Sequence, residues 1–238
     1  MGSPQGDLMN SKLQTVAAFC GVGFVAFATL GWWTIAGMIP PISPGLGPEE
    51  VAAFYQTNTG AIRFGVVIGM ISGALTIPWI ALIAVHMQRA EGPMPILSVC
   101  QVVAGAVTVV ILLLPFVLWT VAAYRPERAP ELIQLTSDFG WMLIVMTFGP
   151  FFVQLMSIGL AILLDKNSPP IFPRWVAYFN IWVAVLFIPG VLITFFKSGP
   201  FAWNGILAFW LPLVVFFAWY FVMFAILLRV IKEQAATN

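Results

Sequence analysis

Residues that usually carry chemistry inside membranes are scarce in this chain. It has one histidine, His86, whereas a bis-histidine haem needs two and membrane di-iron enzymes need clusters of them. The lysines all lie at the ends of apolar runs, so none is placed to form a retinal Schiff base in mid-membrane. We therefore expect no cofactor and identify no catalytic residue and no metal-binding set. We expect His86 itself to be solvated near a membrane boundary.

One serine has a sequence context that resembles a nucleophile turn. Ser72 stands between Gly69 and Gly73, but the surrounding run is apolar and is expected to be helical. At a helical rise of 1.5 Å per residue, His86 would lie about 20 Å from Ser72, too far for a catalytic pair. Paired aspartates and a glycine-rich phosphate loop are also missing from the sequence. The chain is more typical of a non-enzymatic protein than of an enzyme.

Polar and aromatic residues near one predicted membrane boundary are the candidates for a ligand site. Arg63 begins the second apolar run, Asp138 begins the fourth, and Trp203 and Asn204 lie between the fifth and sixth. Together they would form a polar mouth above an apolar interior. Alternatively, charges simply reach the headgroups and amides join helices. The candidate ligand-binding residues are Arg63, Asp138, Trp141, Gln154, Trp203 and Asn204.

Three glycines indicate close helix packing. Gly65, Gly69 and Gly73 repeat every four residues on the second run. This small-xxx-small pattern lets membrane helices approach closely. The seam formed by these glycines would join either two helices of this chain or this chain to a partner.

The composition requires these residues to be held in a membrane. The chain of 238 residues is 61% hydrophobic and 8% charged, against roughly 25% charged residues in soluble domains. Apolar runs of about 20 residues cross a bilayer as helices, because backbone groups must be satisfied internally there. We predict an all-α polytopic bundle, one transmembrane domain over 1–238, with short loops. The six predicted spans are 13–39, 64–87, 96–122, 139–164, 175–196 and 205–228.

Prolines mark both the loops and the span interiors. Pro40, Pro41 and Pro44 end the first span, and Pro48 followed by two glutamates begins a short amphipathic segment that we predict to be an interfacial helix. Each of the second to sixth spans contains a proline, which frees a carbonyl and bends the helix. These prolines are Pro78, Pro115, Pro150, Pro189 and Pro212. They either are plain kinks or splay the helices and open a cavity.

The distribution of basic residues predicts the orientation. With the amino terminus inside, the short inner segments hold six lysines and arginines and the outer ones hold four. The inner set is Lys12, Arg89, Lys166, Arg174, Arg229 and Lys232; the outer set is Arg63, Arg125, Arg128 and Lys197. This count predicts that both termini lie in the cytoplasm.

The carboxy-terminal 70 residues resemble a group of bacterial proteins. The segments Phe172-Pro173-Arg174-Trp175 and Lys197 to Gly205 are similar to the corresponding half of uncharacterised bacterial multi-span inner-membrane proteins. The resemblance implies a location in the bacterial inner (plasma) membrane and carries no activity with it.

We expect a non-enzymatic membrane protein that binds, or helps to move, an apolar small molecule or a lipid. Its 21 phenylalanines and 10 tryptophans, kinked helices and few polar residues match the character of ligand sites. The alternatives are an accessory subunit of a larger membrane complex and a small secondary transporter. The expected partners are membrane lipids, together with an apolar small molecule, another membrane protein or a second copy of the chain. A net charge of +1 excludes nucleic acid.

Overall fold

A computed structural model describes residues 4–237, and all regular secondary structure within that range is helical. The elements in chain order are α1 (Pro4–Ala28), η1 (Thr29–Ile35), α2 (Pro48–Thr57), α3 (Thr59–Gly73), α4 (Thr76–Glu91), α5 (Ile96–Tyr124), α6 (Pro130–Met146), α7 (Gly149–Leu164), α8 (Arg174–Leu186), η2 (Ile188–Thr194), η3 (Ile206–Trp210) and α9 (Leu211–Thr237).

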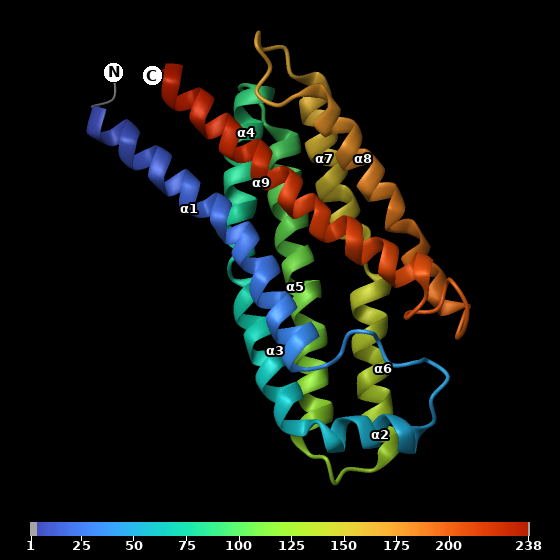
Figure 1. The fold of residues 1–238 in the computed structure, drawn as a ribbon. Coiled ribbons are helices and arrows are strands. Elements are labelled where there is room, and N and C mark those ends of the chain that lie inside the picture. Colours follow the sequence, from blue (N-terminus) through green and yellow to red (C-terminus); the bar gives the residue numbers. More distant parts are fainter. Residues whose placement is uncertain (1–3, 238) are drawn as a thin grey trace.

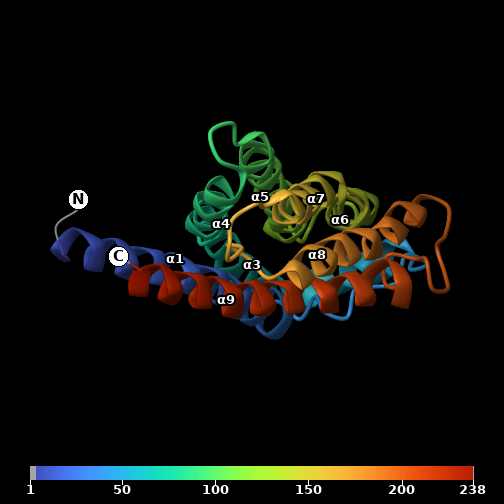
Figure 2. The same ribbon diagram turned by 90° about the horizontal axis from the view of Figure 1, so that it is seen from above.

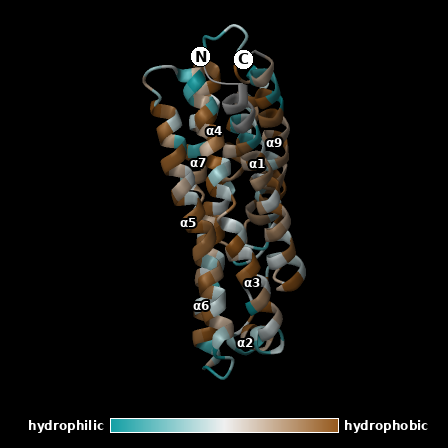
Figure 3. Cartoon of the chain, turned by 90° about the vertical axis from the view of Figure 1, so that its left-hand side faces the viewer, coloured by the Kyte–Doolittle hydropathy of each residue, from teal (hydrophilic) through white to brown (hydrophobic). Residues whose placement is uncertain are grey.

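The helices combine into six segments that are long and apolar enough to cross a membrane. These spans are α1 with η1, α3 with α4, α5 alone, α6 with α7, α8 with η2, and η3 with α9. Hydrophobic residues dominate their length, and hydrophilic residues gather at the two ends (Figure 3). The predicted all-α polytopic bundle is therefore confirmed. Several helices run further than predicted: α6 begins at Pro130 rather than 139, because its amphipathic first turns stay helical beyond the apolar run.

The bundle has two distinct ends. The amino-terminal end of α1 and the carboxy-terminal end of α9 lie at one end, here called the terminal end, and α2 lies across the other, here called the α2 end (Figure 1). Helices α1 and α9 run side by side as one layer, and α3 to α7 lie behind them (Figure 2). The first and last spans thus close one side of the bundle.

The short helix predicted after the first span is confirmed as α2. One face of it is buried against α6, where the Tyr55 hydroxyl donates a hydrogen bond to Ser137 Oγ at 3.0 Å. The preceding loop is also tied down, because Gln134 Nε2 donates to the carbonyl oxygen of Leu46 at 3.0 Å. Helix α2 is therefore packed on the bundle as well as amphipathic.

The regular α-helices of the second and fourth spans end where prolines remove hydrogen-bond donors. A proline cannot donate to the carbonyl four residues earlier. Pro78 cannot donate to the carbonyl of Ala74, which accepts from the Ile77 amide at 3.3 Å instead, and α3 gives way to α4 at that point. Pro150 frees the carbonyl of Met146, the last residue of α6. These two spans are therefore each built from two helices.

The fifth and sixth spans change helix type near their prolines. Helix α8 is followed by the 3-10 helix η2, which contains Pro189. The π-helix η3 directly precedes Pro212, the second residue of α9. By contrast, α5 passes through Pro115 without ending. In the second, fourth, fifth and sixth spans, the break separates a part near the terminal end from a part near the α2 end.

Two packed clusters follow from this division. The cluster toward the terminal end is built around Trp79, Trp219 and Phe172, and the cluster toward the α2 end around Trp119 and Trp141. All five side chains are almost fully buried. The helix breaks lie between the two clusters, and so does the cavity described next.

Candidate binding cavity

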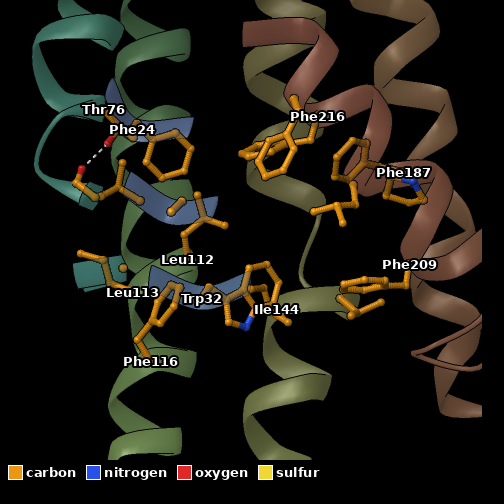
Figure 4. Close-up of a pocket in the computed structure, with 18 of the residues that line it drawn as sticks. Phe24, Trp32, Thr76, Leu112, Leu113, Phe116, Ile144, Phe187, Phe209 and Phe216 are labelled. Carbon is orange, nitrogen blue, oxygen red and sulfur yellow. Dashed lines mark hydrogen bonds between the residues drawn. The ribbon is translucent and has the colours of Figure 1, made fainter. Parts of the chain in front are cut away.

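A cavity of about 110 Å³ lies inside the bundle between the two clusters (Figure 4). Residues from all six spans line it. They are Phe24, Ala28, Trp32, Gly69, Gly73, Thr76, Val109, Leu112, Leu113, Phe116, Ile144, Val145, Phe187, Ala208, Phe209, Pro212, Leu213, Phe216 and Phe217. The cavity is therefore a property of the complete bundle and not of any pair of helices.

Small residues and helix breaks keep this space open. Ala28 and Ala208 face it from the first and last spans, and Gly69 and Gly73 face it from α3. The ends of α3 and α6 and the start of α9 border it, because Gly73, Val145 and Pro212 are lining residues. A well-packed core would fill such a space with side chains.

The cavity wall is almost entirely apolar. Thr76 supplies the one side-chain hydroxyl among the lining residues, and that hydroxyl donates to the carbonyl oxygen of Gly73 at 2.6 Å (Figure 4). No charged side chain lines the space. Phe24 lies on one wall, and Phe187 and Phe216 lie on the opposite one (Figure 4). The site is thus suited to an uncharged, apolar molecule.

Stacked tryptophans form the wall toward the α2 end. The Trp32 ring lies parallel to the Trp119 ring, with centroids 5.7 Å apart, and the Trp119 and Trp141 centroids are 4.8 Å apart. The indole nitrogens of all three are buried and have no hydrogen-bond partner among the described residues. A Cβ at Gly140 would overlap Trp119 Nε1, so this glycine makes room for the ring. The cluster gives the cavity a rigid floor.

Two of the sequence-predicted ligand residues lie near the cavity but do not line it. Trp141 is fully buried in the tryptophan cluster, behind Trp32. Gln154, in α7, is buried, and its amide nitrogen lies 3.0 Å from the position that a Cβ on Gly105 would occupy. The absence of a side chain at Gly105 in α5 therefore makes room for the Gln154 amide of α7.

The other four predicted ligand residues lie toward the α2 end. The exposed Arg63 guanidinium lies over the Tyr124 ring, 5.5 Å from its centroid. Asp138 is half-buried and lies within electrostatic reach of Lys197. Trp203 Nε1 donates to the carbonyl oxygen of Ile42 at 2.8 Å.

Asn204 is half-buried beside Trp203 in the turn before η3. None of these four residues is among those that line the cavity. A polar mouth formed by them therefore stays a prediction.

The predicted helix-packing glycines contact other parts of the same chain. A Cβ at Gly65 would lie 2.6 Å from the amide nitrogen of Ala36, just after η1. A Cβ at Gly69 would meet the Phe116 ring at 2.6 Å, and one at Gly73 would meet the Leu113 side chain. All three glycines are buried. The seam thus joins α3 to the first and third spans of this chain.

The α2 end is closed by hydrogen bonds between distant segments. In addition to the Trp203–Ile42 and Tyr55–Ser137 bonds, Gln56 Nε2 donates to the carbonyl oxygen of Pro126 at 2.7 Å. Burial raises the pKa of the Tyr55 phenol above its ordinary value, although the hydrogen bond with Ser137 acts in the opposite direction. Tyr55 is therefore a neutral donor at physiological pH.

Sequence reasoning was wrong about His86. The histidine is fully buried, its Nδ1 accepts a hydrogen bond from Arg89 at 3.1 Å, and the Phe172 ring covers it edge-on. The loop between α7 and α8 folds over the end of α4, a contact that local hydropathy does not reveal. Asn167 in that loop donates to the carbonyl oxygen of Arg89 at 3.0 Å.

The cavity-lining phenylalanines were not singled out from the sequence. Phenylalanine occurs throughout the chain, so its type alone does not distinguish Phe187 or Phe209 from exposed residues such as Phe195. The sequence feature that could have indicated the cavity is the set of prolines inside the spans, because the helix breaks near them lie at the depth of the cavity. Comparison of the chain with models of known protein families, with curated proteins and with solved structures gave no match.

Proposed function

We propose that this membrane protein binds an apolar small molecule, or the apolar part of a lipid, in the cavity between its two packed clusters. The main observation in support of this proposal is an apolar space lined by residues of all six spans. Neither Gly65, Gly69 nor Gly73 is left for a partner chain. The binding role is therefore better supported than that of an accessory subunit.

The energetic argument concerns the cost of an unfilled space. Core cavities cost about 24 cal/mol per Å³ in a well-studied soluble protein. The apolar space of about 110 Å³ likewise leaves its lining side chains without part of their dispersion contacts. An apolar ligand offsets this cost because it restores dispersion contacts with the walls.

Two variants of α1, each with one alanine replaced by leucine, test the binding role. Ala28 is buried and lines the cavity, whereas Ala26, two residues earlier, is exposed on the lipid-facing side. Native mass spectrometry of wild-type protein released from nanodiscs should show a stoichiometric adduct. Ala28→Leu should lose this adduct because the new side chain occupies the cavity, and Ala26→Leu should keep it. An adduct equally abundant on both variants would contradict the assignment to this cavity.

We further propose that the protein resides in a bacterial inner membrane with its terminal end in the cytoplasm. The support is the excess of lysine and arginine in the segments predicted to be cytoplasmic, six against four. A carboxy-terminal green fluorescent protein fusion should fluoresce, and an alkaline phosphatase fusion at the same position should be inactive. The opposite pair of results would reverse the orientation without affecting the cavity.

A further inference from the structure

We infer that the cavity selects a compact, ring-shaped hydrocarbon group that carries no hydrogen-bond acceptor, an inference that rests on the proposed binding role. Two features lead to it: the chemical groups that face the space, and the size and outline of the space itself.

The first feature is the absence, among the lining residues, of a side-chain donor that is both unpaired and exposed to the space. Their hydrogen-bonding side chains are Thr76 and Trp32. The Thr76 hydroxyl proton is already donated to the carbonyl oxygen of Gly73. The Trp32 indole nitrogen is buried within the aromatic cluster and is not exposed to the cavity. A ligand acceptor atom would therefore lose its hydrogen bonds with water and gain none from these side chains.

The second feature is the small volume of the space and its aromatic lining. A cavity of about 150 Å³ engineered in another protein accommodates benzene, and the present one measures about 110 Å³. Phe24, Phe116, Phe187, Phe209 and Phe216 approach it from several directions (Figure 4). Aromatic rings on several sides favour another ring, because offset and edge-to-face contacts become available. A straight acyl chain offers no ring for such contacts.

Three probes of similar size separate these features. Benzene represents a free ring hydrocarbon, pyridine is the same ring with one acceptor nitrogen, and n-hexane represents the end of a straight lipid tail. Binding is measured by equilibrium dialysis of the delipidated protein in detergent at pH 8, where pyridine is neutral. Headspace gas chromatography quantifies each probe, and protein-free micelles give the correction for partitioning.

We expect benzene to bind at least ten-fold more tightly than either pyridine or n-hexane. Ala28→Leu should abolish benzene binding and Ala26→Leu should preserve it. If Ala28→Leu does not fold, Ala208→Leu fills the same space from the sixth span.

Each other pattern of probe binding would contradict a different part of the inference. Equal binding of pyridine and benzene would overturn the exclusion of acceptors and leave the proposed function standing. Binding of n-hexane as tight as that of benzene would overturn the ring preference and point to a lipid tail. If none of the three probes binds, the proposed function fails together with this inference.

Discussion

Gly31 and Gly65 bring the backbones of the first and second spans into direct contact. A Cβ at Gly31 would lie 2.8 Å from the amide nitrogen of Gly69, and a Cβ at Gly65 would lie 2.6 Å from that of Ala36. The atoms in the way are backbone atoms, which cannot swing aside as a flexible side chain can. This contact fixes Trp32, the residue after Gly31, against the tryptophan cluster that forms the cavity floor.

Gly65→Ala should therefore destabilise the protein by about 2 kcal/mol, within the range found for overpacked cores. Gly60 on the same helix is the matched control, because a Cβ there would meet no atom within 4 Å. Gly60→Ala should raise stability by about 0.5–1 kcal/mol, since alanine loses less backbone entropy than glycine. The measurement is the free energy of unfolding from SDS titrations in mixed micelles. Equal effects at the two positions would show that the close contact is not formed.

A buried hydrogen bond joins the fifth and sixth spans between Asn180 and Trp219. Trp219 Nε1 donates to Asn180 Oδ1 at 2.8 Å, and both side chains are almost fully buried. Asn180→Leu should cost about 1–3 kcal/mol because the indole N–H is left without a partner. A double-mutant cycle with Trp219→Phe should give a coupling free energy of about 1 kcal/mol. Strict additivity of the two substitutions would argue against the bond.

Gln101 is the opposite case, a buried amide with no partner. Its side chain is fully buried in α5, and neither amide atom has a hydrogen-bond partner among the described residues. Gln101→Leu should therefore raise the free energy of unfolding by about 1–3 kcal/mol, since the cost of an unsatisfied polar group disappears. Gln88→Leu, at an exposed position on α4, should have little effect. A loss of stability in Gln101→Leu would reveal an internal water bound to this amide.

The pKa of Tyr55 leads to a pH dependence that can be measured. Because burial raises this pKa in the folded protein, the folded state holds the phenol proton more tightly than the unfolded state, whose value is about 10. The stabilisation is fully present below pH 10 and is lost as the pH rises above it. The stability difference between wild type and Tyr55→Phe should therefore shrink above pH 10. A difference that stays constant up to pH 11 would contradict the burial of this phenol.

The positions of the helix breaks could be predicted from the sequence, but the way they meet could not. Pro78 and Pro150 each remove a donor from a carbonyl four residues earlier, which is a local effect that any reader of the sequence can locate. The sequence does not say that these breaks lie at one depth around a common space. That outcome depends on the tilt of α1 and α9 and on which helix faces are turned inward (Figure 1).

The predicted ligand residues show the same limit. Arg63, Asp138 and Asn204 are candidates on sequence grounds because polar groups are rare in a lipid environment, and the structure places them toward the α2 end. The cavity instead uses residues whose types are common in this chain, such as Phe209 and Phe216. A rare polar residue can be recognised in the sequence. A cavity lined by common apolar residues cannot, because it depends on how their helices pack.

The sequence by itself determined that this protein spans a membrane with six helices and follows its first span with a short amphipathic helix. Both results depend on local hydropathy and on backbone groups that must be satisfied within each segment. The tertiary structure decided that Gly65, Gly69 and Gly73 contact this chain's own helices, that His86 is buried, and that residues of all six spans line one apolar cavity. These features required the structure because they depend on contacts between segments far apart in the chain, and hydropathy is equally high on the buried and the lipid-facing sides of a membrane helix.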